Sequence, residues 1–98
     1  MYTVFRSKEF DSWLADLKDA KAKARIVARL KSVEFGNLGD VRSVGGGISE
    51  MRIHYGPGYR VYFTRRDRLL IFLLTAGDKS SQERDIRRAK SLAETLKD

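Results

Sequence analysis

The stretch that decides the fold reads Glu50-Met-Arg-Ile-His-Tyr-Gly-Pro-Gly-Tyr-Arg-Val-Tyr-Phe-Thr64. Apolar and polar residues alternate on both sides of Gly56-Pro57-Gly58, which is typical of two antiparallel strands joined by a turn. A two-residue loop would mix apolar and polar residues on each face, whereas a three-residue loop over residues 56–58 lets the faces match. The sequence therefore predicts a hairpin with two core pairs, Ile53 with Val61 and Met51 with Phe63.

The second face of this hairpin is polar in the same register. His54 is expected opposite Arg60, and Arg52 opposite Tyr62, with Glu50 on the same face. Exposed antiparallel strands often carry arginine and tyrosine simply as a solvated surface. Three groups that can be cationic beside a phenol also fit a site for an anionic ligand. The alternation alone leaves both interpretations open.

Length and composition limit the class of protein. The chain has 98 residues, 42% of them hydrophobic, so we expect a single domain over residues 1–98 with one core. It has no cysteine and one histidine, which argues against disulfides and a zinc site, and we expect no metal and no cofactor. The N-terminus lacks the apolar core of a signal peptide, and the longest apolar run, Leu69–Leu74, is too short to span a membrane. A cytoplasmic protein is predicted.

The charge of the chain indicates the kind of partner. Its formal net charge is +7, and its isoelectric point is near 10.0. Such a field attracts polyanions, including nucleic acid, the ribosome, an anionic membrane or an acidic protein. Charge does not choose among these partners.

The first half of the chain predicts a strand followed by two helices. Tyr2–Phe5 has the β-branched and aromatic residues of a short strand, and Ser7 is a suitable N-cap for the first helix. A break is expected near Asp19-Ala20. The helical spacing of apolar residues predicts buried faces made of Phe10, Trp13, Leu14 and Leu17 in the first helix and of Ala22, Ile26, Leu30 and Val33 in the second.

The remaining segments complete an α+β pattern. Residues 38–47 are expected to form a loop, in which Gly45-Gly46-Gly47 makes a bend or bulge, because no Lys-Ser/Thr follows as in a phosphate-binding loop. Leu69–Thr75 is apolar on both faces, which predicts a central strand. Ser80 and Glu83 have the spacing of a capping box for the last helix. The expected order is β-α-α-β-β-β-α, a compact fold with a mainly antiparallel sheet covered by helices.

Two segments resemble a known family. The run from Val44 to Tyr62, which contains Gly-Pro-Gly-Tyr-Arg-Val-Tyr, and the segment Leu73–Gln82, which contains Gly-Asp-Lys-Ser-Ser-Gln, are similar to the HigB-like addiction-module killer proteins. These proteins belong to the RelE/ParE toxin superfamily, so the resemblance implies the RelE-like fold. The resemblance covers almost the whole chain, including its length and the order of its elements.

The resemblance implies a toxin of a type II toxin–antitoxin system. Its partner would be a cognate antitoxin, often a DNA-binding helix-turn-helix protein, in a toxin–antitoxin hetero-oligomer. In the RelE and HigB branches the implied activity is that of an mRNA interferase, an endoribonuclease that cleaves translated mRNA on the ribosome. In the ParE branch it is inhibition of DNA gyrase without nuclease activity. A non-catalytic nucleic-acid-binding domain is a third alternative.

Candidate site residues follow from that resemblance and from the polar face. Arg60 lies on the strand where RelE-like toxins place a key arginine, and guanidinium groups bind phosphate bidentately. The last aromatic residue is Phe72, so the chain lacks the C-terminal aromatic of some RelE members, which leaves the general acid and base open. The candidate catalytic residues are Arg60, Arg52, His54 and Tyr62, and the candidates for binding or orienting the RNA phosphate are Lys79, Arg65 and Glu50.

Overall fold

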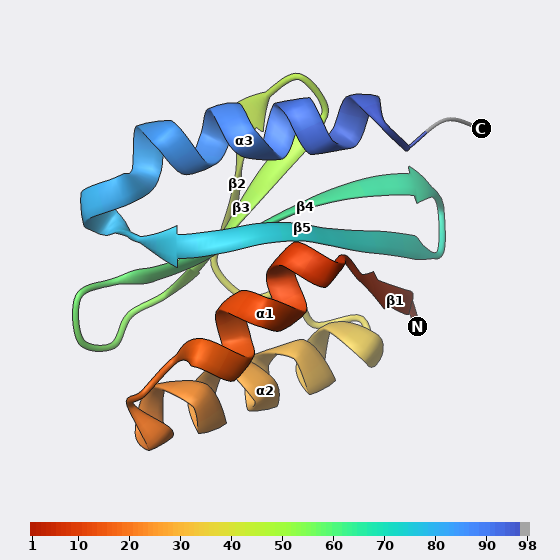
Figure 1. The fold of residues 1–98 in the computed structure, drawn as a ribbon. Helices are drawn as coiled ribbons and strands as arrows, with labels where there is room; N and C mark the ends of the chain where they lie inside the picture. Colours follow the sequence, from red (N-terminus) through yellow and green to blue (C-terminus); the bar gives the residue numbers. More distant parts are fainter. Residues whose placement is uncertain (97–98) are drawn as a thin grey trace.

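The computed structural model describes residues 1–96, which form a five-stranded sheet with helices on both faces (Figure 1). This arrangement confirms the predicted α+β class. Among these residues, none of the helices combines the length and the apolar character needed to cross a bilayer. In chain order the elements are β1 (Thr3–Arg6), α1 (Lys8–Asp16), α2 (Ala20–Glu34), β2 (Val41–Gly45), β3 (Ile48–Ile53), β4 (Tyr59–Asp67), β5 (Leu70–Asp78), the 3-10 turn η1 (Lys79–Ser81) and α3 (Gln82–Glu94).

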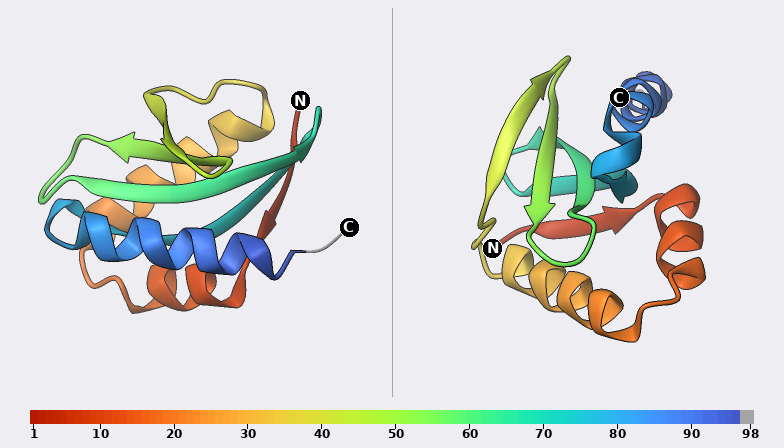
Figure 2. Two further views of the ribbon diagram at one scale, coloured as in Figure 1. Left: turned by 90° about the horizontal axis from the view of Figure 1, so that it is seen from above. Right: turned by 90° about the vertical axis from the view of Figure 1, so that its left-hand side faces the viewer.

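The sheet order is β1-β5-β4-β3-β2, with β1 parallel to β5 and every other pair antiparallel. Figure 2 shows α3 running along one face of the sheet and α2 along the other. Because helices cover both faces, β5 is buried almost throughout, as its apolar sequence predicts.

The expected loop at residues 38–47 is partly wrong, because Val41–Gly45 forms the edge strand β2. It pairs with β3, and its register shifts between Ser43 and Gly45. Gly45, Gly46 and Gly47 all have positive φ, so the glycine run makes the bulge and turn expected of it. The segment is polar and rich in glycine, so its composition does not predict a strand. It forms one because it pairs with β3.

The register of the central hairpin differs from the prediction by two residues. Met51 pairs with Val61 and Ile53 with Tyr59, so five residues rather than three connect the strands. Tyr55 leaves the ladder and packs under the guanidinium of Arg25 in α2, whose Cζ lies 4.7 Å from the ring centroid. A shift of two residues preserves the alternation, so the predicted apolar face still points into the core.

The two N-terminal helices form the expected helical hairpin. Ser7 Oγ accepts a hydrogen bond from Phe10 N at 2.9 Å, and Asp19 Oδ1 caps α2 by accepting from Lys21 N and Ala22 N. The Asp19 cap starts α2 where the sequence predicts a break. The second helix buries all four of the predicted residues: Ala22, Ile26, Leu30 and Val33.

The start of α3 differs from the predicted capping box. Asp78 Oδ1 accepts from Ser80 N at 2.8 Å and caps η1, whereas Ser81, the N-cap of α3, makes no side-chain cap. Ser81 Oγ instead donates to Asp85 Oδ2 at 2.5 Å. This turn sets α3 over the hairpin face that was predicted to be polar, and it buries part of that face.

Candidate functional site

The carboxylate of Glu50 is the centre of the covered face. Glu50 lies on β3, is fully buried and holds side chains from three other elements. Its Oε1 accepts from Arg42 Nε at 3.2 Å, and its Oε2 accepts from Tyr62 Oη at 3.1 Å and from Gln82 Nε2 at 2.7 Å. Arg60 Nε lies 3.5 Å from the same Oε2. A buried carboxylate is stabilised by such partners, and it in turn fixes their positions.

Tyr62 is fully buried rather than part of an open polar face. It packs with Ile48 and Leu74 in the cluster beneath α3. Burial, followed by the adjacent Glu50 carboxylate, raises the pKa of Tyr62 far above its ordinary value. Its hydroxyl therefore keeps its proton at neutral pH and acts as a donor to Glu50.

Arg60 is also more enclosed than the alternation predicts, with 12% of its side chain exposed. Its Nη1 donates to the carbonyl of Gly58 at 3.0 Å, while its buried Nε lacks a hydrogen-bond partner. In the observed register Arg60 lies opposite Arg52 rather than His54. Directly opposed side chains are about 5 Å apart at Cβ, so the Arg60 and Arg52 side chains leave neighbouring strands side by side. Each is paired with a different carboxylate.

Asp40 is the second carboxylate. It lies just before β2, where its Oδ1 accepts from Arg52 Nη2 at 3.1 Å and its Oδ2 lies 2.5 Å from His54 Nε2. The hydrogen bond from His54, followed by that from Arg52, lowers the pKa of the Asp40 carboxyl. The His54 side chain is 73% exposed and sits just beyond the end of β3. A carboxylate thus orients an accessible imidazole beside an arginine.

Arg29 of α2 supports the backbone that carries Asp40. Its guanidinium donates to the carbonyls of Leu38, Asp40 and Arg52 at 2.8–3.1 Å. Burial lowers the pKa of Arg29, although the Asp40 carboxylate opposes this shift. Gly39 has a φ of +70°, and a Cβ there would lie 2.5 Å from Arg29 Nε. The close approach therefore needs glycine, and α2 fixes the position of the Asp40–His54 pair.

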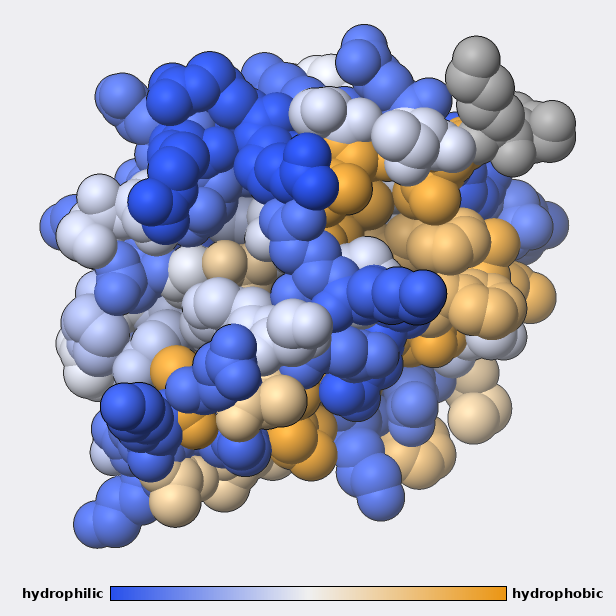
Figure 3. Space-filling model, in the orientation of Figure 1, coloured by the Kyte–Doolittle hydropathy of each residue, from blue (hydrophilic) through white to orange (hydrophobic). Residues whose placement is uncertain are grey.

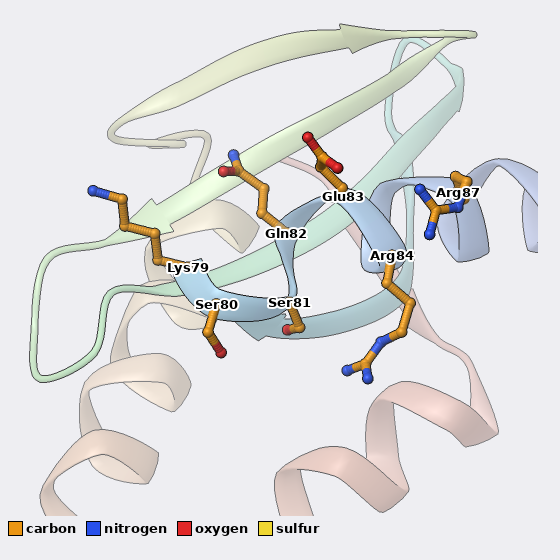
Figure 4. A pocket seen from close by; sticks show the side chains of 7 residues that line it. All are labelled: Lys79, Ser80, Ser81, Gln82, Glu83, Arg84 and Arg87. Atoms are coloured by element: carbon orange, nitrogen blue, oxygen red, sulfur yellow. The ribbon is translucent and has the colours of Figure 1, made fainter.

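The two remaining predicted site residues lie in different places. Lys79 is exposed in η1, next to Gly58 and the hairpin turn, and it lines a depression of about 600 Å³ with Gln82, Arg84 and Arg87. In Figure 4, Gln82 points toward the hairpin strands and Arg84 points away from them. Arg65 lies five residues along β4 from Arg60, about 17 Å at the usual strand rise. The structure therefore separates Arg65 from the cluster.

A family model described as "Phage derived protein Gp49-like" matches residues 12–98. The chain belongs to the Gp49-like family. An uncharacterized protein of Haemophilus influenzae is 54% identical over 87 residues, covering 89% of this chain and 88% of that protein. A mutant of the Escherichia coli toxin RelE, solved in the free state, matches with a TM-score of 0.60 and 14% identity over 98% of both chains. This likeness shows that the Gp49-like chain has the RelE fold.

The Gp49-like chain thus brings most of the predicted site residues onto one strand pair and its borders. Arg60 and Tyr62, two of the candidate catalytic residues, both contact the Glu50 carboxylate. Sequence reasoning missed four residues that hold the cluster, because all four lie outside the hairpin: Arg29, Asp40, Arg42 and Gln82. For Gln82 there was a signal, because it ends the Gly-Asp-Lys-Ser-Ser-Gln segment of the family resemblance.

Proposed function

We propose that this Gp49-like protein is the toxin of a type II toxin–antitoxin system, and that it is a HigB-like mRNA interferase that cleaves translated mRNA on the ribosome. The family membership and the RelE fold support a toxin. The observation that carries the finer proposal is the pairing of Arg60 with buried Glu50 beside the Arg52–Asp40–His54 group. This arrangement offers preorganised cations and one titratable side chain near the hairpin turn between β3 and β4.

The arginines supply the electrostatic part of the reaction. In the proposed step the 2′-oxygen of the RNA attacks its own 3′-phosphate, and the bond to the 5′-oxygen of the next nucleotide breaks. The phosphate gains negative charge in the transition state, which Arg60 and Arg52 stabilise. A third of the Arg52 side chain is exposed, so a ligand can reach its guanidinium. Because DNA lacks the 2′-hydroxyl, the nuclease acts on RNA.

Two observations assign the proton transfers: Tyr62 is unable to accept a proton, and His54 is exposed to a ligand. Tyr62 stays protonated and buried, so it positions Glu50 and does not accept a proton. His54 is exposed, and imidazole is the side chain whose ordinary pKa lies closest to neutrality. We assign His54 to proton transfer at the reacting oxygens, with Asp40 as its positioning residue. Lys79, beside the hairpin turn, adds a contact to the RNA backbone.

The charge of the protein fits the proposed partners. A net charge of +7 favours approach to the ribosome and its mRNA, and it also favours an antitoxin with an acidic segment. The proposed reaction takes its nucleophile from the RNA itself, so the protein needs to supply only positioning, charge and proton transfer.

Induced expression in a bacterium without the antitoxin tests the proposal. Growth should stop, and mapping of transcript ends should find new ends inside translated codons. DNA damage with intact mRNA would instead identify a ParE-like inhibitor of gyrase. Normal growth with confirmed folded protein would contradict the toxin assignment altogether.

A further inference from the structure

A hollow of about 460 Å³ lies beside His54, between α2 and the end of β3. Ile53 and Ala28 give it apolar walls, and its other lining residues are polar or charged: Arg25, Arg29, Ser32 and His54. Small-molecule sites of roughly 300–1,000 Å³ commonly combine such apolar surface with a few polar groups. Because the hollow shares His54 with the proposed site, a ligand in it would lie next to the reacting oxygens.

Arg25 is the lining arginine whose hydrogen-bond donors are free. The guanidinium of Arg29 is engaged by backbone carbonyls. Arg25 is exposed, and within residues 1–96 its guanidinium makes no hydrogen bond or ion pair. It contacts the ring of Tyr55, whose centroid lies 4.7 Å from Cζ. An aromatic ring contacts a guanidinium through its face, so the N–H edges of Arg25 remain available to a ligand.

The contact with Tyr55 also restricts where the arginine can lie. Tyr55 N donates to the carbonyl of Ile53 at 2.9 Å, and the carbonyl of Tyr55 accepts from Gly58 N at 3.1 Å, so the backbone that carries the ring is fixed. An unrestrained arginine loses conformational freedom when it binds a ligand. A guanidinium that already lies on a ring loses less, so Arg25 is preorganised beside the hollow.

The free N–H edge of Arg25 matches one RNA base better than the other three. Guanine carries two adjacent acceptors, N7 and O6, and a guanidinium donates to both. Adenine has an amino donor in place of O6, and the pyrimidines lack N7, so neither accepts the same pair of hydrogen bonds. Single-stranded RNA exposes these base edges, and its bases also stack on aromatic rings and guanidinium planes. The chemistry of the hollow therefore favours guanine.

Charged side chains lead an RNA backbone toward the same place. Figure 3 shows hydrophilic side chains gathered over the N-terminal half of α3, whose cations include Arg84 and Arg87. Lys79 precedes that helix and lies next to Gly58, at one end of the hairpin connection, and His54 lies at the other end. An RNA backbone held by these cations brings a neighbouring base to the hollow.

We propose that the hollow between α2 and His54 binds a guanine base of the mRNA next to the cleaved bond, and that Arg25 donates to its N7 and O6 atoms. This inference rests on the proposed mRNA interferase function and adds a sequence preference to it. Any other base in the hollow lacks that pair of acceptors and leaves donors of Arg25 unpaired. Cleavage should therefore favour sites with guanine on one side of the cleaved bond.

Modified mRNAs on programmed ribosomes test the proposal. The substrates carry guanosine, 7-deazaguanosine or adenosine at each of the nucleotides that flank the cleaved bond. The 7-deaza base has a C–H group in place of the N7 acceptor. At one of these positions, the wild-type protein should cut the guanosine substrate with a kcat/KM about 5-fold or more above that of the other two, as expected for a bidentate pair.

Two variants of Arg25 and one matched control complete the test. Arg25→Ala should abolish the preference for guanosine. Arg25→Gln should shift it toward adenosine, because an amide pairs with N6 and N7 of adenine, and loss of charge alone would not produce that shift. Lys31→Ala removes a positive charge from an exposed position of the same helix, outside the hollow. It should lower the cutting of all three substrates by the same factor.

Three results would overturn the base site. One is equal cutting of the guanosine and 7-deazaguanosine substrates by the wild-type protein at both positions. Another is an equal loss on all three substrates in Arg25→Ala, which would make Arg25 a contact to phosphate or to ribosomal RNA. The last is an unchanged preference in an Arg25→Ala protein that no longer binds the antitoxin, which would assign this face to the antitoxin.

Wild-type protein that cuts no mRNA would contradict the proposed function instead. The hollow is then tested by calorimetry with trinucleotides of 2′-O-methyl guanosine or 2′-O-methyl adenosine, which cannot be cleaved through the 2′-oxygen. Tighter binding of the guanosine trinucleotide by the wild-type protein, lost in Arg25→Ala, would support the base site. Equal binding of both trinucleotides would overturn it.

Discussion

Arg60 Nε approaches Glu50 Oε2 to 3.5 Å beneath α3, where the Glu50 carboxylate is fully buried. Arg60 is therefore a partner of a buried charge as well as the leading candidate for phosphate binding. Removing one member of a buried ion pair leaves the other charge without compensation. Replacing Arg60 is therefore expected to affect stability as well as ligand binding. Its two roles can be separated by the choice of substitution.

Arg60→Ala should reduce both stability and activity. The remaining contacts of Glu50 limit the loss of unfolding free energy to about 1–3 kcal/mol, while mRNA cleavage should fall about 100-fold or more. Arg60→Lys keeps a positive charge near Glu50 and should recover most of the stability, but little activity, because an ammonium lacks the bidentate fork. Denaturant titration and cleavage of translated mRNA measure the two effects. A folded Arg60→Ala protein with wild-type cleavage would refute the role of Arg60.

Tyr62→Phe separates positioning from proton transfer. The variant removes one donor to Glu50 and should cost about 0.5–1.5 kcal/mol of stability. Because Gln82 and Arg42 still hold the carboxylate, cleavage should stay within about 10-fold of wild type, which is less than the usual loss of a general acid or base. Rate measurements across pH provide the test. A larger loss in a folded protein would show that Tyr62 takes part in proton transfer.

Asp40 and His54 should behave as one unit in kinetics. We expect His54→Gln to lower the cleavage rate about 100-fold, as for loss of an acid–base group. Asp40→Asn should lower it less, because the imidazole remains but loses its orienting carboxylate. The double variant should be no slower than His54→Gln alone. Effects that multiply in the double variant would mean that the two residues act independently.

The Asp40 carboxylate also predicts how stability depends on pH. Its pKa is lowered in the folded protein, so the unfolded chain binds more protons as acid is added. This contribution is present above the ordinary aspartate pKa of about 3.9 and is lost as the pH falls below it. Asp40→Asn should therefore make thermal stability less dependent on pH in that acidic range. The wild type and Asp40→Asn should both keep the part of the pH dependence of stability that comes from Glu9, whose pKa is lowered by Arg88. An unchanged acid profile in Asp40→Asn would contradict the geometry of the pair.

Gly77 should be intolerant of a side chain although it lies within β5. A Cβ there would overlap Asp85 Oδ2 and lie 2.7 Å from Ser81 Oγ, at the contact that seats α3 on the sheet. Gly77→Ala should cost about 1–3 kcal/mol, as for overpacked sites. In an Asp85→Ala background the same substitution should cost much less, because the overlap is removed. Equal costs in both backgrounds, from chemical denaturation, would argue against this contact.

Local periodicity predicted the elements and the core well. The stripe that begins at Ala22 is buried as expected, and the alternation around Met51 and Val61 identifies the correct core face. The exact register could not be predicted, since it depends on the packing of Tyr55 against Arg25, which lies 30 residues earlier in the chain. β2 was missed for a related reason: its pairing comes from β3 rather than from its own composition.

The site was predicted only where its residues lie on the hairpin. Glu50 and Arg60 share a face through strand alternation, and periodicity reveals that relationship. Asp40 meets His54 only after β2 has folded back along β3, so local sequence patterns do not reveal the pair. The burial of Tyr62 required knowing that α3 crosses this face. Charged groups on a predicted polar face are therefore open to two interpretations until the covering helix is placed.

The most direct test of the central claim uses the purified protein with mRNA on programmed ribosomes. One mRNA is unmodified, and the other carries a 2′-deoxynucleotide at the position of cleavage. The account predicts that the unmodified mRNA is cut to a 2′,3′-cyclic phosphate and a 5′-hydroxyl and that the deoxy substrate is not cut there. Arg60→Lys should cut the unmodified mRNA far more slowly than wild type. Cleavage of the deoxy substrate at the same position would contradict the account. So would intact unmodified mRNA after incubation with wild-type protein that arrests growth in cells.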